Sequence, residues 1–194
     1  MSDSIKVRKR NGRGIEPLNL EKMHKMVEEA TTGLAGVSAS QVEINSGIQF
    51  YDGITTDEIQ SILIRSASDL ISLDNPNYQY VAARLLLFGL RKNLYRRIRE
   101  MPPLIDHINK CVDNGVYDKD ILDNYTEEEL LTAEKFIDHD RDLLFTYAGL
   151  RQVVDKYLVQ DRSTGKVYES PQFMYIMIAL TIFAKYPQDK RLDY

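Results

Sequence analysis

The chain has 194 residues, of which 43% are hydrophobic and 28% are charged, and its formal net charge is −4. This composition is typical of a soluble globular protein, and it argues against intrinsic disorder because enough apolar surface is present to offset chain entropy. The acidic balance excludes nucleic-acid binding by bulk electrostatics. The single cysteine, Cys111, excludes internal disulfides and a cysteine-rich zinc site.

No segment has the pattern of a signal peptide or a membrane span. The first ten residues are charged and are not followed by an apolar segment, unlike a secretory signal. The longest apolar run, 174–184, is too short to cross a bilayer, which needs about 20 residues. We therefore expect a cytoplasmic protein without membrane contact, in which this run forms a buried helix.

The N-terminal segment has the pattern of two short strands. Residues 5–10 alternate apolar and basic side chains, and a short apolar return segment follows at 15–18. Asn11 and Gly12 lie between them, a pair that is typical of type I′ turns because both turn positions need positive φ. Pro17 restricts the return strand to a sheet edge. The segment therefore predicts a small β-hairpin.

Four amphipathic helices are predicted after the hairpin. Asn19 is a good N-cap for the first, and Ser38 opens the second, which is predicted to end near residue 51. Thr55 opens a capping box for the third helix, and Asn75-Pro76 breaks the chain before the fourth. Short connections favour a compact bundle with the hairpin packed on it. The predicted fold class is mainly α, with a small β-hairpin cap on a four-helix bundle.

The paired prolines and the charge run at 96–103 mark a boundary, because proline ends the preceding helix. We therefore expect one domain over residues 1–96 and a second, mainly helical domain with one short hairpin over 97–194. The elements predicted for the second domain are helices over 103–115, 126–137 and about 142–157, a hairpin over 157–170 with its turn at 163–165, and a helix over 171–187.

Basic side chains crowd the hairpin and recur on the first and fourth helices. If the hairpin caps the bundle, these cations can converge with the free backbone N–H groups of helix N-termini, which favours a polyphosphate ligand. The alternative is a solvated basic edge strand, which discourages aggregation. The Walker and G-x-G-x-x-G patterns are absent. The cations are Lys6, Arg8, Lys9, Arg10, Arg13, Lys22, Lys25, Arg91 and Lys92.

Two other groups of residues are weaker candidates for a metal site or a catalytic site. The acidic stretch 138–142 contains one histidine, while His24 and His107 are remote in sequence, so an acidic helix start is favoured over a metal site. Cys111 has no second cysteine with which to run thiol redox chemistry. We therefore expect neither a metal site nor a catalytic residue in this chain.

Four segments of the first domain together resemble the ATP-cone, the allosteric module at the start of many ribonucleotide reductase large subunits. They are 7–12, 16–22, 50–59 and 78–92. Segments of the second domain resemble the continuation of the aerobic, class I large (alpha) subunit. They are more specific than the cone, which also occurs in anaerobic reductases and in a zinc-ribbon repressor. These later segments are 117–130, 136–150, 156–176 and 184–194.

The resemblance implies a nucleotide site, and its residues can be matched position by position. Lys9 and Arg10 of the hairpin would reach the phosphates, and Glu16 and Asn19 would contact the adenine. The effector would be ATP or dATP, with Mg²⁺ carried by the phosphates. The remaining matches are Lys22 on the first helix, Thr56 at the start of the third and Lys92 late in the fourth.

One position departs from the family pattern. The residue four positions after Thr56 is often histidine, near the ribose and phosphates, whereas here it is Gln60. Glutamine can form hydrogen bonds but cannot carry a charge. We therefore expect nucleotide binding to persist and the discrimination between ATP and dATP, and with it dATP inhibition, to be weak.

The resemblance also implies what lies outside this chain. The family's catalytic cysteines and its α/β barrel would follow Tyr194, so the chain alone should be inactive. Its function would be allosteric control of ribonucleoside diphosphate reduction, together with the rest of the large subunit, a small radical-generating subunit and a second large subunit. An excised piece, a fragment and the first product of a split gene fit the sequence equally. The alternative function is a free-standing nucleotide-sensing adaptor, since the cysteine count excludes a zinc-ribbon repressor.

Overall fold

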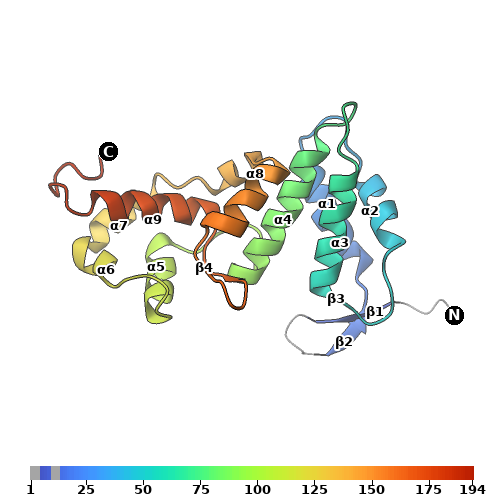
Figure 1. Ribbon diagram of the computed structural model, residues 1–194, viewed down its shortest axis with the longest axis horizontal. Helices are drawn as coiled ribbons and strands as arrows, with labels where there is room; N and C mark the ends of the chain where they lie inside the picture. Colours follow the sequence, from blue (N-terminus) through green and yellow to red (C-terminus); the bar gives the residue numbers. More distant parts are fainter. Residues whose placement is uncertain (1–4, 10–13) are drawn as a thin grey trace. The chain divides into compact units, whose positions relative to one another are not determined.

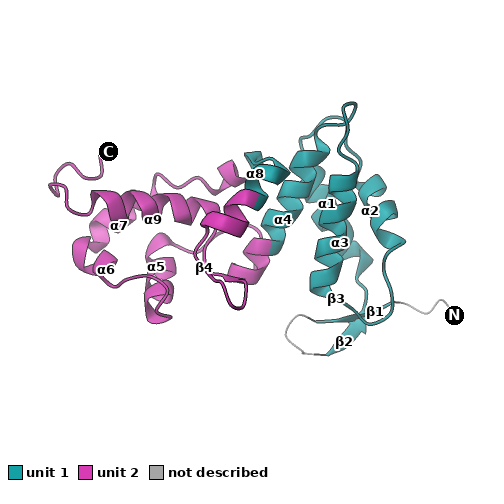
Figure 2. Ribbon diagram, in the orientation of Figure 1, with its two compact units in different colours: residues 1–89, 143–151 teal, residues 90–142, 152–194 magenta. Residues whose placement is uncertain are grey.

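The computed structural model describes residues 5–9 and 14–194, which form two compact units (Figure 2). The first unit comprises residues 1–89 and 143–151, and the second comprises 90–142 and 152–194. The division between Gly89 and Leu90 falls within one helix, α4 (Tyr78–Tyr95). Each unit is described separately below.

The first unit contains a three-stranded sheet at the start of the chain (Figure 1). β1 (Lys6–Arg8) pairs antiparallel with β2 (Ile15–Pro17), which confirms the predicted hairpin, although Asn11 and Gly12 lie outside the described residues. A third strand, β3 (Ile54–Thr55), pairs in parallel with β1 and was not predicted, because two residues are too few to show a strand pattern.

Four helices complete the first unit's predicted bundle, and their starts agree with the capping signals. Asn19 accepts a hydrogen bond from the Lys22 N–H, and the Thr55 capping box is complete. The second helix ends at residue 47, not near 51 as predicted, because tight turns then redirect the chain toward β3. The helices are α1 (Leu20–Thr31), α2 (Ala39–Gly47), α3 (Thr56–Asp69) and α4 (Tyr78–Tyr95).

The second unit is helical with one hairpin, as expected. Gly165 takes a positive φ of 69° in the hairpin turn, where a side chain would be strained. The five-residue helix α6 was not predicted, because it is shorter than two helical turns and shows no periodicity. The elements are α5 (Leu104–Asp113), α6 (Asp120–Asn124), α7 (Glu127–Glu134), β4 (Gln160–Asp161), β5 (Lys166–Val167) and α9 (Pro171–Phe183).

The single helix predicted over 142–157 is wrong. The segment instead contains a 3₁₀ helix (His139–Leu144), α8 (Tyr147–Gln152) and a π-helical turn (Val153–Tyr157). The Thr146 hydroxyl accepts a hydrogen bond from the Gly149 N–H at 3.2 Å, so a new helix starts there. Asp142 lies within the 3₁₀ helix, and its buried carboxylate pairs with Arg91.

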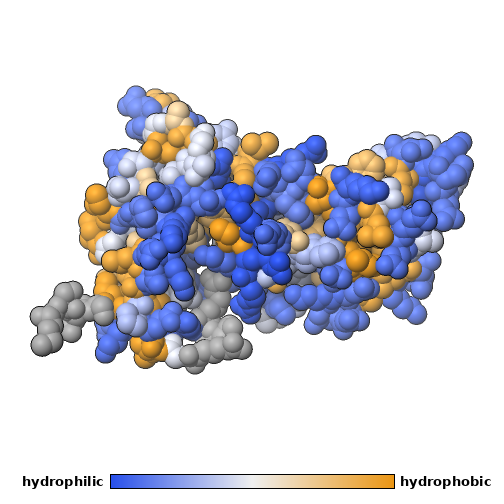
Figure 3. Space-filling model, turned by 180° about the vertical axis from the view of Figure 1, so that it is seen from behind, coloured by the Kyte–Doolittle hydropathy of each residue, from blue (hydrophilic) through white to orange (hydrophobic). Residues whose placement is uncertain are grey.

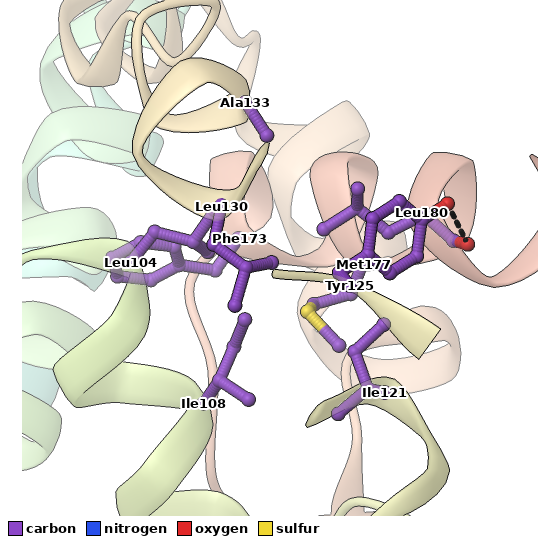
Figure 4. Close-up of a cluster of buried hydrophobic side chains, with 9 residues drawn as sticks. All are labelled: Leu104, Ile108, Ile121, Tyr125, Leu130, Ala133, Phe173, Met177 and Leu180. Carbon is purple, nitrogen blue, oxygen red and sulfur yellow. Dashed lines mark hydrogen bonds between the residues drawn. The ribbon is translucent and has the colours of Figure 1, made fainter. Parts of the chain in front are cut away.

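The core of the second unit joins α5, α6, α7 and α9 (Figure 4). The Tyr125 side chain lies in this core, and its hydroxyl donates to the Leu180 carbonyl oxygen at 2.7 Å, so this buried polar group is paired. The buried members are Leu104, Ile108, Ile121, Tyr125, Leu130, Ala133, Phe173, Met177 and Leu180.

The apolar helix α9 is only partly buried, which corrects the expectation of a buried helix. Tyr175, Ile178 and Ile182 are 47%, 49% and 61% exposed, and their spacing places them on one face. Hydrophilic residues cover most of the surface in Figure 3, and apolar residues form separate groups over both units. Among the residues that the structure describes, none of the helices combines the length and apolar character needed to cross a membrane.

Candidate functional site

The register of the small sheet places Lys9 beside the start of α3. Arg8 of β1 is paired with Thr55 of β3, and Thr55 is the N-cap of α3. The two strands are parallel, so the next residues of each, Lys9 and Thr56, leave the sheet at the same edge. A lysine at this edge therefore adjoins the positive end of a helix dipole, an arrangement that favours anions.

Lys9 forms an ion pair with Glu16 of β2. The Lys9 Nζ and Glu16 Oε2 atoms are 2.7 Å apart, and each side chain is 45% exposed. Exposed pairs of this kind contribute about 0–1 kcal/mol to stability. A phosphate can therefore compete for Lys9 at small cost, and the same exchange would release Glu16.

A second part of the site lies where β2 leads into α1. A surface hollow of about 470 Å³ is lined by Glu16, Asn19 and Lys22 together with intervening residues. The Asn19 Oδ1 atom accepts the Lys22 N–H at 2.8 Å, so the cap uses the oxygen of this side chain. The amide nitrogen of Asn19 is the part that can donate to a ligand.

The start of α3 is held by its capping box. Glu58 accepts hydrogen bonds from the Thr55 N–H and hydroxyl and from the Tyr51 hydroxyl, and these bonds lower the pKa of Glu58. The adjacent Thr56 Oγ1 atom is buried and has no hydrogen-bond partner among the described residues. Such groups are rare in folded proteins, and this one belongs to a predicted site residue.

Gln60 lies one helical turn after Thr56, with only 8% of its surface exposed. Its Nε2 atom donates to the Leu85 carbonyl oxygen of α4 at 2.7 Å. The side chain fits against Gly89, where an added Cβ would lie 3.0 Å from Gln60 Cγ. Gln60 is therefore turned toward α4, and its amide is already engaged. Gly89 was not among the residues predicted for the site.

Replacing Gly89 by alanine should destabilise the first unit by about 1 kcal/mol. Overpacking against Gln60 costs about 1–3 kcal/mol and outweighs the gain of about 1 kcal/mol in helix propensity. In a Gln60→Ala background the contact is gone, so Gly89→Ala should become stabilising. Urea unfolding followed by circular dichroism would measure the free energy of unfolding of the wild type, the two single variants and the double variant. Equal effects of Gly89→Ala in both backgrounds would contradict the proposed contact.

The remaining predicted cations behave differently. Arg91 is buried, and its guanidinium pairs with Asp142 at 3.0 Å and donates to the His139 carbonyl oxygen at 2.6 Å. The expectation that Arg91 joins a phosphate-binding cluster is therefore wrong. Lys92 lies in the last turn of α4, within the second unit. Arg10 lies outside the described residues.

The two parts of the chain match two families. The ATP cone domain model matches residues 5–93, and the model of the all-alpha domain of ribonucleotide reductase matches residues 143–193. Over all 194 residues the chain is 50% identical to ribonucleoside-diphosphate reductase 1 subunit alpha of Escherichia coli K12. Over its whole length the chain is thus similar to part of a ribonucleoside-diphosphate reductase alpha subunit. This confirms the resemblance drawn from its sequence motifs.

Other reductase alpha subunits show the same relationship. The chain is 50% identical over its whole length to the subunit of Haemophilus influenzae, and 42% identical over 168 residues to that of Enterobacteria phage T4. It spans about a quarter of the length of these relatives, 25% and 22% respectively. Every candidate nucleotide-site residue, from Lys9 to Lys92, falls within the segment matched by the ATP cone.

Proposed function

We propose that residues 1–96 are the regulatory domain of a reductase alpha subunit and bind ATP or dATP with Mg²⁺. The observation that carries this proposal is the parallel β1–β3 register, which sets Lys9 beside the N-terminus of α3. The phosphates would lie at Lys9 and Arg10, near Thr56, and the Mg²⁺ would be carried by the phosphate oxygens.

The adenine would lie in the hollow beside β2 and α1. Glu16 and Asn19 line that hollow and offer an acceptor and a donor to a base edge. Lys22, on its rim, would contribute a further positive charge, and Lys92 is assigned to the phosphates by its match to the family pattern. The base and the phosphates would then be bound by different segments, which makes recognition specific for a nucleotide.

Residues 97–194 are proposed to be the first part of the N-terminal helical domain of the same subunit. The complete subunit would reduce ribonucleoside diphosphates together with a small radical-generating subunit, as a homodimer. Cys111 does not supply that chemistry, because it is 4% exposed and burial raises its pKa to about 11. The named relatives are reductase subunits, which favours this function over a free-standing adaptor.

Replacing Lys9 by alanine should weaken the binding of magnesium ATP to the chain by about tenfold or more. A charge-assisted hydrogen bond to phosphate contributes about 1.5–3 kcal/mol, and the alanine variant loses it. Calorimetric titration measures the effect directly. Lys25→Ala is a matched control, because Lys25 belongs to the basic cluster but is not one of the family-matched site residues, and it is exposed on α1, where it pairs with Glu21 at 2.6 Å. Equal affinities for the Lys9 variant and the wild type would refute the site.

The complete alpha subunit should show weak dATP inhibition although dATP binds. Gln60 is uncharged and its amide is engaged by Leu85, so it offers little to distinguish a ribose from a deoxyribose. A ligand shifts an assembly equilibrium only through different affinities for the two states. Reduction assays across a dATP series, with size measurement of the complexes, test this. Strong inhibition with a new large assembly would contradict it, and Gln60→His should strengthen inhibition.

A further inference from the structure

The second unit contains a cavity of about 660 Å³ that belongs to none of the proposed nucleotide contacts. Its walls come from three segments: the end of α4 with the residues after it, one face of α5, and the β4–β5 hairpin. Four cations line it, Arg96, Arg97, Lys110 and Lys166, whereas Asp106 is the one carboxylate among its lining residues. The cavity therefore has a net charge of +3 in a chain whose formal net charge is −4.

The four cations are not neutralised within the described structure, where none lies within 4.0 Å of a carboxylate oxygen. Lys110 donates to the Leu94 carbonyl oxygen at 3.4 Å, and Arg97 donates to that of Glu100 at 3.1 Å. The Lys166 ammonium lies 4.6 Å from the centre of the Tyr168 ring. These neutral contacts orient the side chains and leave their charges available to an anion.

Two residues of the segment that follows α4 have an uncommon backbone conformation. Arg96 has a φ of 64° although it carries a side chain, and Glu100, four residues later, has a φ of 56°. Non-glycine residues adopt this region rarely and at some cost in free energy, and they concentrate at functional positions. Arg96 takes this conformation directly after the end of α4, and Arg96 and Arg97 both line the cavity.

The inner wall is aromatic and neutral. Tyr95 and Tyr168 line the cavity, and His107 packs edge-on against Tyr95 at a centroid distance of 6.0 Å. Burial lowers the pKa of His107 to about 4, so this ring is uncharged at neutral pH. Asn93 and Asn114 add amide groups to the lining. A ligand with several negative charges and a flat ring would match both the four cations and this aromatic wall.

We propose that this cavity is a second anion site, which binds the polyphosphate chain of a small molecule. Three segments carry the four charges, so a chain of two or more phosphates would contact more of them than a single phosphate. Two sources share this chemistry, a nucleoside polyphosphate and an inorganic polyphosphate. The aromatic wall favours the nucleoside form, since rings stack on tyrosine.

The test is titration of the Lys9→Ala chain with inorganic tripolyphosphate and, separately, with ATP. The cavity variant is Arg97→Glu with Lys166→Glu, and its control is Lys119→Glu with Lys135→Glu, which changes the net charge equally at exposed positions outside the cavity. We expect the cavity variant to lose about tenfold or more in tripolyphosphate affinity and the control to lose less than about twofold. Circular dichroism spectra would verify that both variants are folded.

Backbone amide resonances locate the ligand in the same samples. Shifts at 93–97, 106–114 and 165–168 are expected with tripolyphosphate. Tighter binding of ATP, with shifts at Tyr95 and Tyr168, would identify a nucleotide as the ligand, whereas equal affinities would identify the phosphate chain alone. Equal weakening in the cavity and control variants, or shifts confined to residues outside these segments, would overturn the proposal.

Discussion

Replacing Arg91 by methionine should lower the free energy of unfolding of the second unit by about 3–5 kcal/mol. The Arg91 and Asp142 side chains are 3% and 0% exposed, so the substitution leaves a buried carboxylate without its cation. Gln172 still donates to Asp142 at 3.1 Å, but one neutral hydrogen bond cannot replace a buried charge partner. The carbonyl oxygens of Ile98 and His139 also lose a donor.

Arg141→Met is the matched control for Arg91→Met. Arg141 also pairs with an aspartate, Asp138, at 3.6 Å, but the two side chains are 69% and 55% exposed, so its loss should cost less than about 1 kcal/mol. Adding Asp142→Leu to Arg91→Met should restore part of the stability, because the unpaired charge is removed. Urea unfolding of the four proteins would show these differences. Equal stability of the two single variants would mean that Arg91 does not hold the second unit together.

Acidification should destabilise the second unit through His107, by about 3 kcal/mol between pH 6.5 and pH 4. Burial lowers the pKa of His107 from 6.5 to about 4, whereas an unfolded chain has the ordinary value. The unfolded state therefore binds more protons in this window, and the stability that is present above pH 6.5 is lost as the pH falls. His139 acts in the same direction, with a pKa lowered to about 4, mainly by burial.

Other groups titrate in the same pH range, so the free energy of unfolding of the His107→Gln variant is compared with that of the wild type at each pH. Burial raises the pKa values of Glu169 and Asp142, and these groups oppose the histidines. His107→Gln should reduce the loss of stability on acidification by about 3 kcal/mol, which is the contribution of His107. His24→Gln is the control, because His24 is exposed and its pKa is raised, mainly by a hydrogen bond with Glu43. An unchanged pH dependence for His107→Gln would show that His107 does not cause the loss of stability in acid.

The parts of the fold that depend on neighbouring residues in sequence were predictable. Asn19, Thr55 and Thr126 cap helices with the hydrogen bonds that their patterns indicate, because an N-cap contacts residues only two or three positions away. Strand β3 was not predictable, because its two residues are selected by pairing with β1, about 46 residues earlier. Within 139–157, the Thr146 cap is local, whereas the position of the 3₁₀ helix also depends on a distant partner, since Arg91 pairs with Asp142.

The candidate site shows the same division between local and distant causes. Charge pattern and family motifs indicated Lys9, Glu16 and Asn19, and the structure sets Lys9 against Glu16 and lines one hollow with Glu16 and Asn19. The same pattern included Arg91, because sequence does not show that Asp142 lies opposite it. The direction of Gln60 was equally hidden, since it depends on a glycine and a carbonyl oxygen of α4.

The central claim is that a nucleotide binds where β1, β2 and the N-termini of α1 and α3 meet. The most direct measurement is a titration of the labelled chain with magnesium ATP, followed through its backbone amide resonances. Saturable shifts are expected at residues 7–9, 15–22 and 55–60, and they should be lost at the same ATP concentrations in Lys9→Ala. Saturable binding that leaves these three segments unshifted, or that persists in the Lys9 variant with unchanged affinity, would contradict it.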